Sequence, residues 1–140
     1  MIHESVAEYL GSAVDALAYS ETDEGNVFID HYPSTPDRVV ALYSAAGPES
    51  DSKLPYDAVR LQVIVRCEFG GTWGLRTWED IYSALHGLRN VTLPDGTEVI
   101  FLLAEQSTPF RLSPDAEGRV MLSAHFRGET LNVTQHRGGT

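Results

Sequence analysis

The sequence predicts a single α+β domain, in which a mainly antiparallel or mixed sheet carries two helices packed on one face. The expected order is α-β-β-β-α-β-β-β. Two segments carry apolar residues at helical spacing, and others alternate apolar and polar residues as strands do. The strands come in runs with helices between them, which is typical of antiparallel sheets. No linker or repeat divides the 140 residues, so we expect one domain over residues 1–140 with a loose polar tail at 135–140.

The first helix is predicted over residues 2–18, where apolar side chains recur at intervals of three and four. Short strands are predicted at residues 27–31 and 38–43. Pro33 and Pro36 lie between these two strands. Because proline lacks the N–H group that a central ladder requires, this connection is expected to stay outside the sheet.

The longest predicted strand covers residues 58–67 and alternates strictly. The residues expected to point inward are Val59, Leu61, Val63, Val65 and Cys67. The opposite face carries Arg60, Gln62, Ile64 and Arg66.

The second helix is predicted from its apolar stripe, which consists of Leu75, Trp78, Ile81, Tyr82, Leu85 and Leu88. Thr77 is followed three residues later by Asp80, which resembles a capping box. We therefore expect the regular helix to begin at Thr77.

The remaining strands are predicted from turns. Residues 90–93 and 98–104 flank Pro94-Asp95-Gly96 and indicate a hairpin. Residues 98–104 are apolar on both faces, as expected of a central strand. A turn at 113–118 precedes an alternating strand at 119–127. Its inward side chains are expected to be Val120, Leu122, Ala124 and Phe126.

Composition excludes some classes of function. The chain has 20 acidic and 10 basic residues and a formal net charge of −10, which argues against a nucleic-acid grip and against anionic membranes. Its one cysteine, Cys67, cannot form an internal disulfide, which fits a reducing compartment. No signal peptide is visible at the N-terminus.

The sequence shows no pattern that indicates catalysis. The five histidines lack metal-ligand spacing, and no nucleophile elbow or phosphate-binding glycine loop occurs. Cys67 is expected to be an ordinary buried thiol. The adjacent carboxylates at 23–24 and 79–80 are interpreted as solvated charges. We therefore expect no catalytic, cofactor-binding or metal-binding residue, and we expect that the protein is not an enzyme.

The polar face of the long strand leaves two interpretations open. Arg60 and Arg66 share it with Gln62. Arginine suits bidentate carboxylate pairing and protein interfaces, but two solvated charges could equally protect an exposed sheet face. Trp78 fits the buried stripe of the second helix, whereas Trp73 lies off it and is a candidate for a partner contact.

Several stretches, taken in order, resemble the tail terminator or minor capsid protein family of long-tailed bacteriophages. They are the amphipathic N-terminal helix, the Pro-x-x-Pro-Asp loop and apolar strand at residues 32–43, the alternating strand at 59–66, and the turn and strand that start at Ser113. The match of order and spacing covers most of the chain.

This resemblance implies a virion structural protein of the neck, assembled in the host cytoplasm, with no cofactor. It implies a ring, usually of six copies, on the head-proximal end of the tail tube. Such a ring stops tube polymerisation and joins the tube to head-completion or stopper proteins. The expected partners are further copies of itself, the tail tube protein and those neck proteins, while viral DNA passes through the channel without specific binding. The candidate interface residues are Pro33, Pro36, Asp37, Arg60, Gln62, Arg66, Trp73, Asp115, Glu117 and Arg119.

A closed ring needs two different complementary patches on each copy. The Gln and Arg face of the long strand is one candidate, and the acidic loops at 20–24, 49–51 and 115–117 are the other. Part of the negative charge is expected to line the channel, where it repels DNA. Two alternatives remain: another head–tail connector or stopper subunit of similar fold, and a small ligand-binding domain or enzyme. The latter predicts a pocket with perturbed titrating groups.

Overall fold

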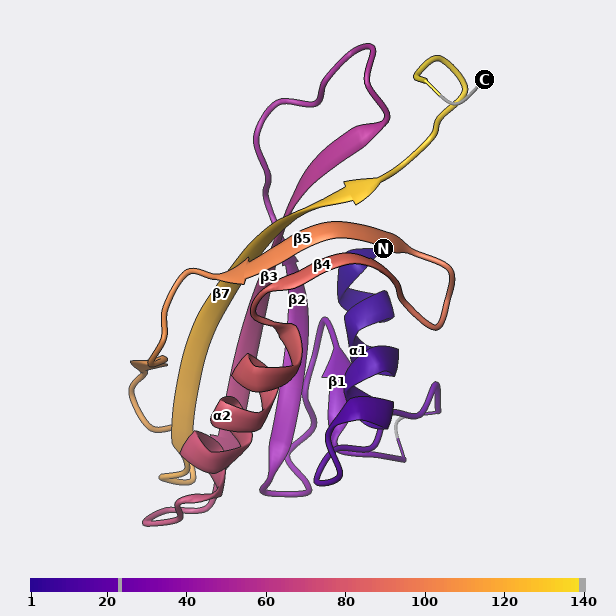
Figure 1. Ribbon diagram of the computed structural model, residues 1–140. Coiled ribbons are helices and arrows are strands. Elements are labelled where there is room, and N and C mark those ends of the chain that lie inside the picture. Colours follow the sequence, from indigo (N-terminus) through magenta and orange to yellow (C-terminus); the bar gives the residue numbers. More distant parts are fainter. Residues whose placement is uncertain (23, 139–140) are drawn as a thin grey trace.

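In the computed structural model, which describes residues 1–22 and 24–138, two helices cover one face of a seven-stranded sheet (Figure 1). The predicted fold class is confirmed, and the predicted order is confirmed with one addition, the two-residue strand β6. The elements are α1 (Ile2–Ala13), β1 (Val27–Ile29), β2 (Val39–Ala45), β3 (Tyr56–Cys67), α2 (Trp73–Leu85), β4 (Leu88–Thr92), β5 (Glu98–Ala104), β6 (Phe110–Arg111) and β7 (Val120–Leu131).

The sheet has the strand order β1-β2-β3-β7-β5-β4. Only β1 and β2 run parallel among the described strands. β3 and β7 pair along their whole length, from Tyr56 opposite Leu131 to Cys67 opposite Val120, and so form the spine of the domain. β5 pairs with the C-terminal half of β7, whereas β6 pairs with its N-terminal half at Ser123.

The hydrophobic core lies between this sheet and the two helices. The inward residues predicted for the two long strands are confirmed: those of β3 are buried except for the partly buried Val59, and those of β7 are buried or packed against the core. The predicted hairpin is formed by β4 and β5, and β5 lies between β7 and β4, as expected of an interior strand. No helix within the described ranges is long and apolar enough to cross a membrane.

Helix α1 ends at Ala13, five residues earlier than predicted. Val14 already has an extended backbone, although its N–H group still donates to the carbonyl oxygen of Leu10. Val14 and Leu17 remain buried because the chain continues along the same core after it leaves the helix. Apolar spacing therefore predicted the burial correctly and the end of the helix wrongly.

Helix α2 begins at Trp73, so the predicted start at Thr77 is wrong. Thr77 is buried within the helix, and Leu75, which was assigned to the buried stripe, is 41% exposed. The buried face is turned toward Gly74, where an added Cβ atom would lie 3.2 Å from Sγ of Cys67. The small glycine lets the first turn of α2 approach the sheet closely, and this contact sets the rotation of the helix.

One projection extends beyond the sheet, at the top of Figure 1. It consists of residues 46–55 and 132–138 together with the first two residues of β3, Tyr56 and Asp57, and we call it the arm. Arg137 holds the two segments together: its Nη1 donates to Oδ1 of Asp57 at 2.7 Å and its Nη2 donates to the carbonyl oxygen of Asn132 at 2.8 Å. The backbone of Asn132 also donates to the carbonyl oxygen of Pro55 at 2.6 Å.

The C-terminal segment therefore differs from the loose tail expected from its polar composition. Asn132 and Arg137 bond to residues 51–57, whereas residues 139 and 140 of the predicted tail lie outside the described part of the chain. Composition indicated few apolar contacts, but it did not show that Arg137 would be nearly buried against Asp57.

The arm provides a stability prediction. Replacing Arg137 with alanine is expected to separate the C-terminal segment from residues 46–55, because Arg137 contributes hydrogen bonds to both segments. Limited proteolysis should then cut residues 46–55 faster than in the wild type. Arg127→Ala is the matched control, since Arg127 is exposed and has no ion pair among the described residues. Equal cleavage rates in both variants would contradict this role of Arg137.

Candidate functional site on the uncovered sheet face

Both helices pack on one face of the sheet, so alternate residues of β2, β3 and β7 face the other side, which none of the described helices covers (Figure 1). The strand register places these residues in rows across the sheet. One row joins Ala41, Ile64 and Ser123; the next joins Tyr43, Gln62 and His125; and the third joins Ala45, Arg60 and Arg127. The face thus changes from apolar to charged along β3.

The polar residues of this face bond mostly to one another. Nε2 of Gln62 donates to Oγ of Ser123 at 3.2 Å. Nε of Arg60 donates to Oε2 of Glu105 at 2.7 Å, so the charge of Arg60 is paired within the chain. An exposed pair of this kind contributes little to stability, which leaves both side chains free to exchange partners at an interface.

Arg66 occupies the apolar end of the same face and is only 1% exposed. Its Nη2 donates to the carbonyl oxygens of Pro33 and Pro36, each at 2.7 Å, and its Nε donates to that of Asp37 at 3.2 Å. The ring of Tyr32 lies over the guanidinium at 5.3 Å. Burial lowers the pKa of Arg66. The side chain of Arg66 thus holds the loop at 32–38 across the end of the sheet, and we call this loop the proline loop.

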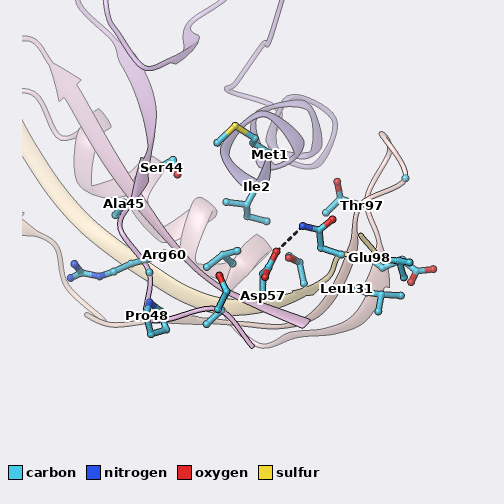
Figure 2. Close-up of a pocket in the computed structure, with 18 residues that line it drawn as sticks. Met1, Ile2, Ser44, Ala45, Pro48, Asp57, Arg60, Thr97, Glu98 and Leu131 are labelled. Atoms are coloured by element: carbon cyan, nitrogen blue, oxygen red, sulfur yellow. Dashed lines mark hydrogen bonds between the residues drawn. The ribbon is translucent and has the colours of Figure 1, made fainter. Parts of the chain in front are cut away.

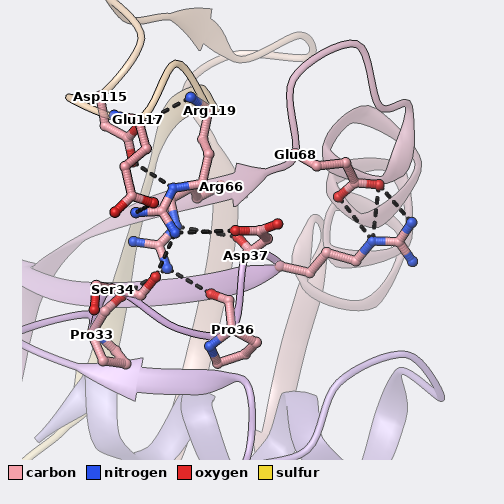
Figure 3. Close-up of polar contacts among 10 residues, drawn as sticks. Pro33, Ser34, Pro36, Asp37, Arg66, Glu68, Asp115, Glu117 and Arg119 are labelled. Atoms are coloured by element: carbon pink, nitrogen blue, oxygen red, sulfur yellow. Dashed lines mark hydrogen bonds and ion pairs between the residues drawn. The ribbon is translucent and has the colours of Figure 1, made fainter.

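Arg119 continues this arrangement from the turn before β7 (Figure 3). Its Nε donates to Asp115 at 2.8 Å, and its other nitrogens lie 3.2 Å from carboxylate oxygens of Asp37 and Glu117. The backbone N–H of Arg119 also donates to Asp115, and this bond and the guanidinium lower the pKa of Asp115. We call Arg66, Arg119 and the loops at 32–38 and 113–119 the arginine bracket.

The structure brings most of the predicted interface residues into this bracket. They are Pro33, Pro36, Asp37, Arg66, Asp115, Glu117 and Arg119. Arg60 and Gln62 lie farther along the same face. Trp73 stands apart at the start of α2, where it is half-buried with Arg38 at 5.8 Å from its ring.

The acidic loops predicted as a second patch differ in their surroundings. The carboxylates of 115–117 are paired with Arg119. The loop at 49–51 belongs to the arm. Residue 23 of the loop at 20–24 lies outside the described residues, and with it one member of the carboxylate pair 23–24.

Comparison with known proteins identifies the family. A family model described as bacteriophage tail terminator protein matches residues 9–130. The chain belongs to the bacteriophage tail terminator family. This makes it a structural protein of the virion, in the tail and neck.

One solved structure similar to this tail terminator is a chain from the virion of a native gene transfer agent particle. The two superimpose with a TM-score of 0.58 at 16% sequence identity, over 91% of this chain and 95% of that chain. At this identity the likeness shows a shared fold. No curated protein sequence matched.

Arg38, which immediately precedes β2, is paired with Glu68, which immediately follows β3, with Nη2 and Oε1 2.6 Å apart. The hydrogen bonds from Arg38 lower the pKa of Glu68 from 4.5 to about 2. Because the folded-state pKa is depressed, this contact stabilises the tail terminator fully above pH 4.5 and is lost as the pH falls toward 2. An NMR titration should therefore place the Glu68 midpoint near pH 2, and Arg38→Met should return it toward 4.5. A wild-type midpoint near 4.5 would contradict the pairing.

Sequence reasoning missed two groups of exposed apolar side chains. The first, the arm patch, consists of Leu54, Tyr56 and Val133, which are 57%, 39% and 51% exposed. A second set of exposed apolar side chains consists of Phe69 after β3, Leu75 on α2, and Phe110 and Leu112 at the β6 edge, of which Phe69 is 85% exposed. Apolar residues inside predicted turns, such as Phe69 before two glycines, were the signal that could have indicated them.

The segment that leads to β6 is held against α2. Nε1 of Trp78 donates to the carbonyl oxygen of Ser107 at 2.9 Å, which places α2 beside the segment that leads to β6. Leu75 lies one turn before Trp78 on the same flank of the helix. Arg111 of β6 pairs with Leu122, which contacts the start of α2 at Gly74.

A cleft of about 680 Å³ lies between the base of the arm, the N-terminus of α1 and the β4–β5 turn (Figure 2). Its perturbed carboxylate is Asp57, whose pKa is lowered by hydrogen bonds from Arg137 and Asn132 that hold the arm. No three His, Cys, Asp or Glu side chains within the described residues are grouped to hold a metal ion. The hydrogen bonds of Asp57 therefore belong to the contacts that hold the arm together.

Proposed function

We propose that this tail terminator forms a ring of six copies on the head-proximal end of the tail tube. The ring stops polymerisation of the tube and joins it to the head-completion or stopper proteins of the neck, and viral DNA passes through its channel without specific binding. The observation that carries this proposal is the family match across residues 9–130. The ring, its copy number and its partners go beyond that match and are the content of the proposal.

The surface of the chain supports a ring closed by unlike patches. A closed ring of more than two copies uses head-to-tail contacts, so each copy needs two different surfaces. The arm patch is one such surface, and the exposed Phe110 and Leu112 at the β6 edge, which belong to different elements, offer a second. Contiguous apolar patches on a soluble protein usually mark interaction sites.

The distribution of charge supports the same arrangement. Exposed carboxylates gather on the helices and on the turn that follows α1. Among the described residues of these segments, the exposed arginine is Arg76 of α2. They are Glu4, Glu8, Asp15, Glu21, Glu24, Glu79 and Asp80. Two copies that met through their helices would bring like charges together, which disfavours a symmetric helix-to-helix dimer. Helices that face the channel would instead repel DNA.

Arrest of tube growth is the direct test. Tail tube protein of the same virion is polymerised with and without this chain, and tube lengths are measured by electron microscopy. The proposal predicts that substoichiometric amounts stop elongation, because only the tube ends are occupied. The control is an equal amount of the heat-unfolded chain. Unchanged tube lengths would overturn the proposal, and binding to neck proteins in the absence of tubes would favour another connector subunit.

A further inference from the structure

We propose that, in the assembled ring, the uncovered sheet face of each copy packs against a neighbouring copy of the same chain. This inference rests on the proposed ring and names the surface that joins its copies. The part of the face concerned runs from Tyr56 to Gln62 of β3 and includes the residues opposite them on β2, β7, β5 and β4. We call this part the open face, and its occupant is a second copy of this chain.

The strand register places the side chains of the open face on one side of the sheet. Directly opposed residues of antiparallel strands point to the same side. One row consists of Ala58, Glu129, Phe101 and Arg89, and the next consists of Arg60, Arg127 and Leu103. Farther along, Phe110 of β6 lies opposite Ser123 on the same side, so the exposed β6 edge continues this surface.

An apolar hollow lies in the open face at the foot of the arm. It has a volume of about 270 Å³ and is lined by residues 46–48, by Ala58 of β3 and by Phe101 of β5. The charged side chains that line it are Arg60, Arg127, Glu105 and Glu129. Most of the lining is apolar. A hollow of this kind can take an apolar side chain from a partner, and pockets filled in this way anchor protein interfaces.

The open face is electrically balanced, although the chain carries a net charge of −10. Its charged side chains are Arg60, Arg89 and Arg127 with Glu98, Glu105 and Glu129. The arm beside it also carries both signs, through Glu49, Asp51 and Lys53. The helices and the turn after α1 instead carry mainly exposed carboxylates. Two acidic copies therefore meet with least repulsion when the open face is buried between them.

The arginines of the open face are available to a partner. Arg89 and Arg127 are exposed and form no ion pair with another described residue. Arg60 is paired with Glu105, but both side chains of that pair remain partly exposed. Carboxylates of a neighbouring acidic copy can pair with these guanidinium groups, and such pairs set the register of a contact.

The edges of the sheet are less suited to joining copies. β1 has three residues, and Tyr19 bridges its start on the side away from β2. β4 contains Asn90, whose φ of 52° interrupts the extended backbone. β6 has two residues and follows Pro109. Short or interrupted edge strands hinder pairing between chains, which favours a contact made by the side chains of the face.

Photo-crosslinking of the full-length protein bound to tail tubes tests this contact. A photoreactive amino acid at position 127 should crosslink to another copy of the chain. Crosslinks between copies from position 8, on the exposed side of α1, but not from position 127 would place the contact on the helices and overturn the proposal. Crosslinks from position 127 that go only to the tube subunit or to a neck protein would overturn the contact and leave the ring standing.

Substitutions with matched controls give an independent readout. Arg127→Glu upsets the charge balance of the open face, and Ala58→Trp fills the hollow, so each should reduce occupancy of tube ends by roughly tenfold or more. Arg76→Glu and Ala16→Trp make the same changes at exposed positions outside the face and should keep wild-type occupancy. All four variants should keep the wild-type thermal midpoint, because the four replaced residues are exposed.

The outcomes separate the contact from the proposed function. Wild-type occupancy in both Arg127→Glu and Ala58→Trp overturns the contact. Equal losses in Arg127→Glu and Arg76→Glu would also overturn it, because the loss would then follow net charge and not the open face. A wild-type chain that never assembles on tubes refutes the proposed function and the contact with it.

Discussion

Replacing Arg66 with methionine is expected to lower the free energy of unfolding by about 3 kcal/mol, because three backbone carbonyl oxygens lose their donor in a buried place. Methionine fills the volume of the arginine stem but offers no N–H group. A typical domain has a free energy of unfolding of about 5–15 kcal/mol, so the variant is expected to stay folded at 25 °C. Denaturation by urea, followed by tryptophan fluorescence, measures the change.

Two further variants separate the role of Arg66 from its charge. Arg66→Lys keeps the charge but not the planar fork, so it should recover only part of the lost stability. Arg60→Met changes an arginine on the same face of β3 whose ion pair is exposed, and it should have little effect. If Arg60→Met destabilised the protein as much as Arg66→Met, the arginine bracket would not be what holds the proline loop.

Replacing Gly128 with alanine is expected to destabilise the protein by about 3 kcal/mol, at the upper end of the range for overpacking. A Cβ atom at position 128 would lie 2.3 Å from the carbonyl oxygen of Phe101 and 2.9 Å from Cδ1 of Leu102. The oxygen belongs to the backbone of β5, which pairs with β7 at this point beside a register shift. Relief of the clash therefore requires separation of β5 from β7.

Hydrogen exchange shows where in the sheet the destabilisation by Gly128→Ala occurs. The amides of β5 should exchange faster in Gly128→Ala, while those of β2 should keep their protection. Glu129→Ala is the control, because it changes the adjacent residue without adding an atom at the crossing. A Gly128→Ala variant within about 0.5 kcal/mol of the wild type would show that β5 accommodates the methyl group.

The sequence was sufficient to predict which residues face the core of the long strands. Strict alternation assigned Leu61, Val63 and Val65 of β3 to the buried face, since successive side chains of a strand point to opposite sides. Helix boundaries were less predictable. Val14 and Leu17 keep the apolar spacing of α1 after the helix has ended, because a chain that returns along the core buries the same kinds of residues.

Alternation predicted the sheet face of the candidate residues on β3 but not their contacts. Alternation placed Arg66 on the polar face of β3, where it was interpreted as an interface residue or a solvated charge. Alternation does not show what covers a face, and here the proline loop covers Arg66. The role of these residues in assembly stays a prediction. The arm arises from contacts between residues 80 positions apart, Asp57 and Arg137, which no local pattern reveals.

The most direct test of the ring is a count of copies at each end of a purified tail tube. Labelled protein is bound to tubes, and the copies per tube and their position are measured by single-particle fluorescence and electron cryo-microscopy. The account predicts six copies, all at one end. Copies distributed along the tube, or tubes without bound protein at either end, would contradict it.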